Sequence, residues 1–346
     1  MDNPPPVVTF SELFKKIYAW AQPLIDPWKR LLEAFACLKF VFTFVFMGHC
    51  GLVLSIYLLF TRFYWISLVY YIWLYYDWDT SCRGGRRVNA VLTWKLWEFG
   101  RDYFPISLVK TAELDPSRNY IVGHHPHGVF CFGAFFNYAT ESTRFSDVFP
   151  GINRYLMTLH QMFKMPFFRD YFMCTAAVSV HVDSLKWLLT DNGTGNMGII
   201  VPGGAVEALD AHPGTHRLNL KNKKGFIKKA LQFGADLVPS YSFGEVDIFD
   251  QLSNPEGSQT KSLQQWLTKI CGFSLPLPYA RWCPFLPYRR PITTVVGKPI
   301  AVTKNPSPTQ EDLDNLHCVY VKALKDLFNA HKVNYGIDKD TALDIY

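Results

Sequence analysis

The sequence predicts a mixed α/β fold preceded by an apolar segment long enough to enter a membrane. From about residue 100, short apolar runs alternate with longer amphipathic stretches, which is typical of strands alternating with helices. Upstream, residues 40–60 contain no Asp, Glu, Lys or Arg over a length that can cross a bilayer. These two observations define a membrane-associated part and a catalytic or binding part.

Four apolar runs are predicted as buried strands, and helices are expected between them. The strands are Tyr120–Gly123, Gly198–Val201, Leu237–Phe243 and Thr293–Val296, and one intervening helix is Gly225–Phe233. A last helix is predicted to begin with a capping box at Ser307, Pro308 and Gln310. Its apolar stripe predicts packing rather than chemistry, and comprises Leu313, Leu316, Tyr320, Leu324, Leu327 and Phe328.

Composition supports a membrane association and excludes some classes of function. Only 18% of the 346 residues are charged and 49% are hydrophobic, whereas a soluble domain has about a quarter charged residues. The net charge of +6 suits an anionic membrane or a phosphate-bearing substrate, and it is too small to indicate nucleic-acid binding. The eight cysteines form no CxxC pair, so neither a zinc ribbon nor a redox motif is present.

The chain is predicted to have three parts. Residues 1–35 mix apolar and charged positions and suit either a membrane-interface segment or a helix docked on the core. Residues 36–78 are predicted to form a transmembrane hairpin with spans at about 40–60 and 63–76; two full crossings and a re-entrant hairpin both fit. Basic residues flank both ends, which places residues 79–346 in the cytosol.

The stretch Tyr120–Gly133 (YIVGHHPHGVFCFG) holds the strongest candidate site. Its strand ends in a predicted turn that carries His124, His125 and His127. Strand ends usually hold the chemistry of open α/β sheets, and imidazole accepts protons near neutral pH. Three interpretations of these histidines are open: one is a general base, the group binds zinc, or the group only caps the strand and turn. Zinc is the weaker functional interpretation because adjacent strand residues point to opposite faces, and no thiolate has metal-site spacing.

Two acidic residues follow other predicted strands and could reach this turn. Glu207 follows a glycine pair in VPGGAVEAL, and Glu245 follows a glycine in SFGEVD. In a parallel sheet both loops lie at the same edge, so both can converge on His127. A carboxylate bonded to one ring nitrogen would fix the histidine tautomer. Alternatively, each glutamate only favours the dipole of a helix start.

Backbone amides and basic residues are candidate substrate contacts. The pair Gly203-Gly204 allows close approach of a substrate, and neighbouring amides can hold an oxyanion. Basic clusters could hold nucleotide phosphates, although such runs are usually solvated surface. The candidates for substrate binding are Lys223, Lys224, Gly225, Phe226, Arg289, Arg290 and also Glu245.

Eight blocks together resemble the diacylglycerol acyltransferase type 2 family, which includes monoacylglycerol and wax alcohol acyltransferases. The resemblance runs from about residue 36 to the C-terminus, and the first and last blocks look most like the monoacylglycerol branch. The blocks are Asp102–Tyr120, His125–Gly128 (HPHG), Thr140–Ile152, Pro166–Met173, Gly203–Gly214, Lys223–Leu231, Leu237–Glu245 and Pro287–Ile300.

The resemblance implies an enzyme of the endoplasmic-reticulum membrane whose catalytic domain faces the cytosol, with lipid droplets as a second location. The implied fold is a glycerolipid-acyltransferase-like mixed sheet flanked by helices, with HPHG in place of the usual His-x4-Asp. No histidine of the turn has an aspartate five residues on, so a partner acid from elsewhere is implied, which favours Glu207. We expect acyl-CoA as co-substrate, no cofactor and no metal, and homo-oligomerisation is left open.

The expected reaction is acyl transfer from acyl-CoA to the hydroxyl of a mono- or diacylglycerol. His127 is the expected general base, with His125 as the alternative, and Glu207 is expected to stabilise the imidazolium. Amides near Gly128 or Gly203-Gly204 are expected to receive the oxyanion. A wax synthase acting on long-chain alcohols and a non-catalytic lipid-binding membrane protein are the alternative functions.

Overall fold

A mixed sheet forms the centre of the molecule. The computed structural model describes residues 27–255, 257–271, 276–280 and 285–346, and within them the main sheet has the order β1-β10-β7-β2-β5-β3-β4. Strands β7, β2, β5, β3 and β4 are parallel; β10 is antiparallel to β7, and β1 is parallel to β10. The predicted mixed α/β class is therefore confirmed. The strands are β1 (Ser107–Lys110), β2 (Tyr120–His125), β3 (Asn153–Thr158), β4 (Ala177–Ser179), β5 (Asn196–Ile200), β7 (Asp236–Phe243) and β10 (Thr293–Val296).

The predicted strands are all present, but three other strands of the main sheet were not predicted. Strand β10 matches its predicted range, and β2 continues through His124 and His125, which the sequence had suggested lie at the strand end. Strand β3 was missed because it carries Arg154, which is buried and donates to the carbonyls of Tyr138 (2.9 Å) and Thr140 (2.8 Å). Strands β1 and β4 are only four and three residues long.

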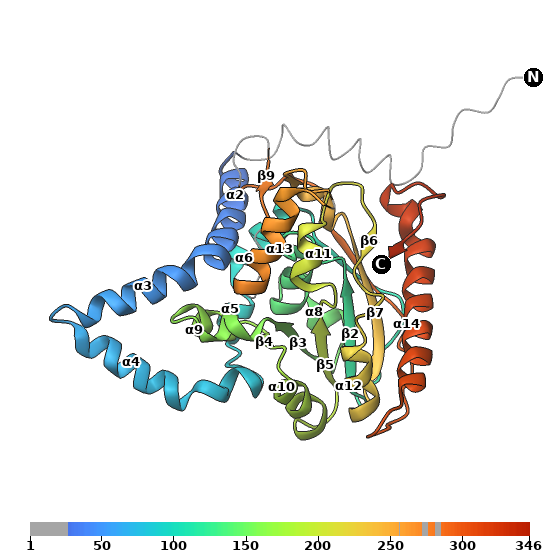
Figure 1. The fold of residues 1–346 in the computed structure, drawn as a ribbon, viewed down its shortest axis with the longest axis horizontal. Coiled ribbons are helices and arrows are strands. Elements are labelled where there is room, and N and C mark those ends of the chain that lie inside the picture. The colour runs from blue at the N-terminus through green and yellow to red at the C-terminus, as the bar shows by residue number, and fades with distance from the viewer. Residues whose placement is uncertain (1–26, 256, 272–275, 281–284) are drawn as a thin grey trace, which may run out of the picture.

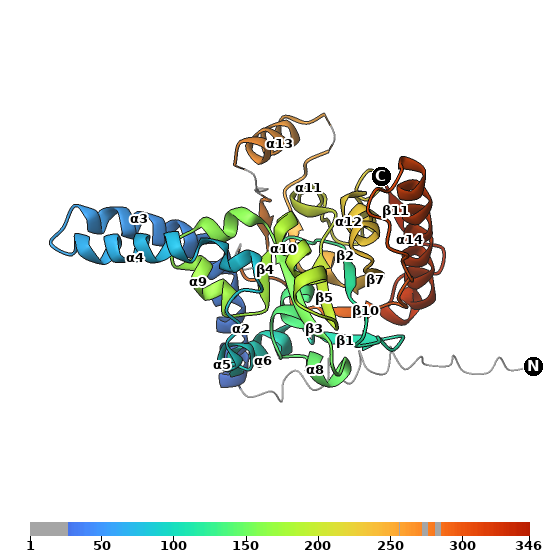
Figure 2. The same cartoon turned by 90° about the horizontal axis from the view of Figure 1, so that it is seen from below.

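Helices cover both faces of the sheet (Figures 1 and 2). One core cluster joins the sheet to α2, α6, α7 and α9, and the other joins it to α10, α12 and α14. The helices are α2 (Pro27–Phe42), α3 (Gly48–Leu59), α4 (Tyr64–Tyr76), α5 (Asn89–Leu92), α6 (Lys95–Tyr103), α7 (Phe132–Ala134), α8 (Phe145–Val148), α9 (Phe168–Met173), α10 (Val182–Lys186), α11 (Gly204–Leu209), α12 (Gly225–Phe233), α13 (Gln259–Cys271) and α14 (Gln310–His331). Short strands β6 (Arg217–Leu218), β8 (Asp250–Gln251), β9 (Pro278–Tyr279) and β11 (Asp344–Ile345) form two small ribbons.

Helix α14 packs as predicted but begins later than predicted. Its capping box consists of Thr309 and Asp312, with Asp312 N donating to Thr309 Oγ1 (3.1 Å) and Thr309 N donating to the Asp312 carboxylate (2.9 Å). The predicted box at Ser307, Pro308 and Gln310 was therefore wrong. A threonine followed three residues later by an acid is the same motif moved by two residues.

The N-terminal apolar helix is partly a core helix. Helix α2 continues through the π-helical segment Thr43–Met47 into α3, so one helical run extends from Pro27 to Leu59. Among the described residues, this run is the one long and apolar enough to cross a membrane. Phe40 and Val41 are buried, and the Phe40 ring lies 4.8 Å from the Phe132 ring. The span predicted to start at residue 40 therefore begins inside the protein core, and the predicted boundary at residues 35–36 falls inside α2. Most of the predicted interfacial segment, residues 1–26, lies outside the described residues.

Helices α3 and α4 project together from the body on the side opposite α14 (Figures 1 and 2). They contact each other through small polar groups: Ser55 Oγ lies 2.8 Å from Tyr71 Oη, and Ser67 Oγ donates to the Ser55 carbonyl (2.8 Å). Their outer surfaces are apolar. The exposed residues include Leu52, Val53, Leu54, Ile56, Tyr57, Phe60, Trp65, Val69, Ile72 and Trp73.

Candidate active site

The end of β2 sends its first two histidines to opposite faces of the sheet, as strand geometry requires. His124 faces η4 (Phe135–Ala139): its Nδ1 lies 3.4 Å from Ser240 Oγ, which in turn lies 3.0 Å from the hydroxyl of Tyr138. His125 faces α14, with Nε2 3.1 Å from the hydroxyl of Tyr320. Both side chains are completely buried.

Burial keeps both of these histidines neutral. Desolvation, with a smaller contribution from a neighbouring histidine, lowers the pKa of His124 and of His125 to about 3. The Tyr320 hydroxyl donates to the Gly123 carbonyl (3.0 Å), so it accepts from His125 and the proton of that ring lies on Nε2. Neither ring is accessible to a substrate.

His127 differs because it is only partly buried and lies beyond the strand. Its Nδ1 lies 3.0 Å from the carbonyl oxygen of Gly128, which can only accept. Nδ1 therefore carries the proton, and Nε2 keeps a lone pair. Burial lowers the pKa of His127 below its usual range, against the opposing effect of the Gly128 carbonyl, so the ring is neutral at neutral pH.

Glu207 reaches the turn from α11, but it does not contact a histidine ring. One carboxylate oxygen accepts from the His127 backbone amide (2.7 Å) and the other from the Asn219 amide (2.9 Å). The expected bond between this carboxylate and an imidazole nitrogen was therefore wrong. Burial raises the pKa of Glu207 to about 7, although both amide donors oppose the shift.

Glu245 holds the far end of the same turn. Its two carboxylate oxygens accept from the amides of Phe132 (2.7 Å) and Gly133 (2.8 Å), and its side chain is completely buried. Burial raises the pKa of Glu245 to about 8, again against the effect of both amides. The loops after β5 and β7 thus converge on the histidine turn, as predicted from the parallel strands.

At two of the predicted oxyanion glycines, a larger side chain would clash with these glutamates. Gly128 has φ of +60°, and a Cβ there would lie 2.7 Å from Glu245 Cγ. A Cβ on Gly203 would lie 1.9 Å from the Glu207 carboxylate. Gly204 has φ of +57° and open space around the Cβ position. The oxyanion role of their amides stays a prediction.

The predicted phosphate-binding residues do not form one cluster. Lys223 lies near enough to Glu207 to act on its charge, whereas Lys224 forms an ion pair with Asp314 on α14. Arg289 forms an ion pair with Glu33 on α2, and its guanidinium lies 4.2 Å from the Tyr103 ring centroid.

The other predicted contacts are also used within the protein. Gly225 starts α12, Phe226 is buried with its ring 5.0 Å from Tyr320, and Arg290 lies over the Tyr288 ring at 5.9 Å. Among the described residues, no group of three or more histidine, cysteine or acidic side chains is placed to hold a metal ion.

Tyr320 was predicted to serve packing alone, yet its hydroxyl contacts β2 at His125 and Gly123. The signal that could have revealed it is Gly123 inside a buried strand, because a strand glycine often marks a close approach. A Cβ on Gly123 would lie 1.9 Å from the Tyr320 hydroxyl oxygen. Asn219 was also missed, and no sequence signal points to it because its contact uses the backbone.

Comparison with known proteins identifies the family. The family model for diacylglycerol acyltransferase matches residues 56–346. The chain belongs to the diacylglycerol acyltransferase family. The predicted family and enzyme class, an O-acyltransferase, are therefore confirmed.

The similar curated proteins have names that specify two acceptors. Diacylglycerol O-acyltransferase 2 of Danio rerio is 47% identical over 91% of this chain and 89% of its own length. The 2-acylglycerol O-acyltransferase 1 of Bos taurus is 45% identical over 93% of this chain and 97% of its own length. Identity at these levels does not separate the two acceptor classes.

One solved structure is also similar. It is the 1-acyl-sn-glycerophosphate acyltransferase PlsC of Thermotoga maritima, which is 14% identical over 86% of this chain and 95% of that chain, with a TM-score of 0.39.

Proposed function

We propose that this family member transfers an acyl group from acyl-CoA to the free hydroxyl of a mono- or diacylglycerol in triacylglycerol synthesis, with His127 as the general base. The names of its relatives support the substrates. The observation that carries the role of His127 is its ring: it is partly exposed, neutral, and has Nδ1 bonded to the Gly128 carbonyl. His124 and His125 lack that exposure.

In this mechanism, Nε2 of His127 takes the hydroxyl proton as the acceptor oxygen attacks the thioester carbonyl. The C–S bond then breaks, and the imidazolium returns the proton to the coenzyme A thiolate. A general base of this kind supplies about a hundred- to ten-thousand-fold in rate. Glu207 acts through the backbone: it fixes the amide of His127 and thereby the position of the ring.

The acyl-CoA phosphates are assigned to the side of the turn near Lys223. Lys224 and Arg289 already neutralise Asp314 and Glu33, so their charges are less available to a ligand. The oxyanion is assigned to the amide of Gly128 or of Gly203, because the Gly204 amide already donates to the Val201 carbonyl (3.2 Å).

We further propose that α3 and α4 form a re-entrant membrane hairpin on the cytosolic face of the endoplasmic reticulum. Helix α4 has 13 residues, or about 20 Å of helix, whereas a bilayer core is about 30 Å thick. Helix α3 has 12 residues, and its Gly48 and Gly51 pack on the body rather than face lipid. A hairpin of this length reaches into one leaflet and returns, which keeps both flanking segments on one side.

The test is to incubate membranes carrying the protein with labelled acyl-CoA and a panel of monoacylglycerol, diacylglycerol and long-chain alcohol. Triacylglycerol or diacylglycerol as product supports the proposal; wax ester alone would assign a wax synthase, and no product would assign a lipid-binding protein. The His127→Ala variant should lose at least about a hundredfold in turnover while staying in the membrane fraction. Wild-type turnover in this variant would overturn the assignment of the base.

A further inference from the structure

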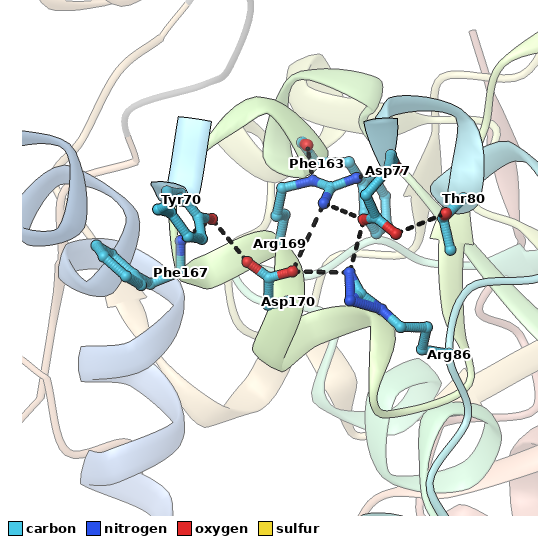
Figure 3. A network of polar contacts seen from close by, with 8 residues as sticks. All are labelled: Tyr70, Asp77, Thr80, Arg86, Phe163, Phe167, Arg169 and Asp170. Carbon is cyan, nitrogen blue, oxygen red and sulfur yellow. Dashed lines mark hydrogen bonds and ion pairs between the residues drawn. The ribbon is translucent and has the colours of Figure 1, made fainter. Parts of the chain in front are cut away.

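A partly buried network of charged residues joins α4 to the catalytic domain where the helix ends. Arg169 of α9 is completely buried and forms an ion pair with Asp77, the residue that caps α4. Arg86 donates 2.7 Å hydrogen bonds to both Asp77 and Asp170. Figure 3 shows the side chains of these two arginines and two aspartates pointing toward one another. The network is neutral in sum, and each charge that folding buries, on Arg169 and Asp77, has an oppositely charged partner.

Tyr70 extends this network into α4 itself. Its hydroxyl donates to Asp170 Oδ2 (2.6 Å) and accepts from the backbone amide of Phe167 (2.8 Å). The Tyr70 ring also stacks on the Phe167 ring with centroids 4.6 Å apart. Phe167 has φ of +61° and ψ of −41°, a backbone conformation that is uncommon for an aromatic residue. A strained backbone held by such contacts is a feature that the surrounding structure must maintain.

Helix α3 meets the same segment of the catalytic domain through glycines. A Cβ on Gly51 would lie 2.5 Å from the Pro166 carbonyl oxygen, and one on Gly48 would lie 3.0 Å from Met165 Cβ. Both arms of the hairpin are therefore fitted to residues 165–170, one by close backbone approach and the other by hydrogen bonds.

An aromatic cluster connects this docking segment to the catalytic turn. Phe44, just before α3, lies 6.4 Å from both Phe168 and Phe172 of α9, and 6.2 Å from Phe130. Phe130 follows His127 by three residues. The hairpin therefore leaves the body beside the turn that carries the base, and its position sets where a lipid next to the hairpin meets that turn.

We propose that Tyr70, with the Asp77–Arg86–Arg169–Asp170 network, positions the hairpin so that a lipid acceptor held in the bilayer reaches His127. This inference rests on the proposed function and the proposed membrane position of the hairpin. These are positioning residues, because none of them reaches the turn. Their effect falls on the acceptor that arrives through the lipid, and not on acyl-CoA, which arrives from water.

The test uses two matched tyrosines on α4. Tyr70→Phe removes the hydroxyl that contacts Asp170 and Phe167, whereas Tyr71→Phe removes a hydroxyl whose contact, Ser55, lies within the hairpin. Each variant is reconstituted in phosphatidylcholine vesicles that contain increasing mole fractions of the long-chain acceptor that the wild type acylates. Parallel assays use a short-chain, water-soluble analogue of the same acceptor.

For Tyr70→Phe, we expect KM for the vesicle-held acceptor to rise about tenfold or more, because the variant loses one hydrogen bond to a charged partner. The KM for acyl-CoA and turnover of the soluble acceptor should stay at wild-type values, as should every parameter of Tyr71→Phe. Gly51→Ala, which disturbs the other arm, should give the same pattern. Equal losses with both acceptors, or no change, would overturn the proposal.

Hydrogen exchange supplies a readout that does not depend on turnover. The amides of residues 165–170 should exchange faster in Tyr70→Phe than in Tyr71→Phe, because the Phe167 amide loses its acceptor. Unchanged exchange in Tyr70→Phe would overturn the docking role. If the wild type acylates no acceptor, the proposed function fails, and the exchange comparison still decides whether Tyr70 docks the hairpin.

Discussion

The two ends of the histidine turn are held in the same way but connect to different parts of the molecule. At each end a buried carboxylate accepts two backbone amides. Glu207 divides its oxygens between His127 and Asn219, which belong to separate loops. Glu245 uses both oxygens on the consecutive residues Phe132 and Gly133. The first end therefore couples the base to the loop that carries Lys223, whereas the hydrogen bonds of the second end reach only the start of α7.

This difference separates catalysis from stability. Losing the Glu207 contact frees the residue that we assign as the base, and it also frees the neighbouring basic loop. Losing the Glu245 contact loosens a helix start five residues farther along the chain. Changes at the two ends should therefore have different effects on turnover and on folding stability. Four experiments can measure this difference.

The largest effect is expected for Glu207→Gln. The new NH₂ group must face one of two amide donors, so either His127 or Asn219 loses its acceptor while the side-chain volume is kept. We expect turnover to fall by about a hundredfold, since a hydrogen bond to a charged group is worth roughly 1.5–3 kcal/mol. The measurement is kcat in vesicles. In the matched variant Glu245→Gln, kcat should fall by no more than about tenfold. Equal losses in the two variants would contradict the distinction between the ends.

The next effect is expected for Gly128→Ala. The added methyl group lies 2.7 Å from Glu245 Cγ and requires φ of +60°, so it disturbs the Glu245 end and the backbone beside His127 together. We expect a loss of folding stability of about 1–2 kcal/mol from the backbone conformation, together with reduced turnover. Thermal unfolding in detergent measures the first and the acyltransferase assay measures the second. A variant with wild-type stability would show that the turn can relax around the methyl group.

The pH dependence of stability should distinguish the ends more finely. A glutamate whose pKa is raised on folding binds more protons in the folded state, so unfolding free energy falls as pH rises from its unfolded pKa to its folded pKa. That window ends at about 7 for Glu207 and at about 8 for Glu245. Between pH 7 and pH 8 we expect a loss of about 1 kcal/mol that is due mainly to Glu245. Glu245→Gln should flatten the curve there, and an unchanged slope would exclude this assignment.

The smallest effect is expected for Tyr320→Phe, which tests whether His125 acts as the base. The variant removes the partner of His125 Nε2 and a donor to the Gly123 carbonyl. We expect a loss of roughly 1 kcal/mol in stability and turnover close to wild type, because the ring of His125 is buried and does not act as base. A loss of about a hundredfold in kcat would instead favour His125 as the base. Chemical denaturation and kcat in vesicles give the two values.

The sequence by itself determined the family, the alternation of strands and helices, and which loops meet. It located the turn because three histidines at a strand end are visible as a pattern. It also placed Glu207 and Glu245 at that turn, because the carboxyl ends of parallel strands lie at one edge. Strands that broke the apolar pattern, such as β3 with the buried Arg154, were not visible in this way.

Only the tertiary structure decided which atoms of these residues meet. Strand alternation places His124 and His125 on opposite faces of the sheet. Their buried partners come from other segments: Ser240, which also contacts Tyr138, lies beside His124, and Tyr320 lies beside His125. Both glutamates contact backbone amides rather than imidazoles, and backbone contacts leave no signature in side-chain identity. The same holds for the hairpin. The sequence shows that the hairpin is apolar and how long it is. The network that docks it joins charges about 90 residues apart, which only folding brings together.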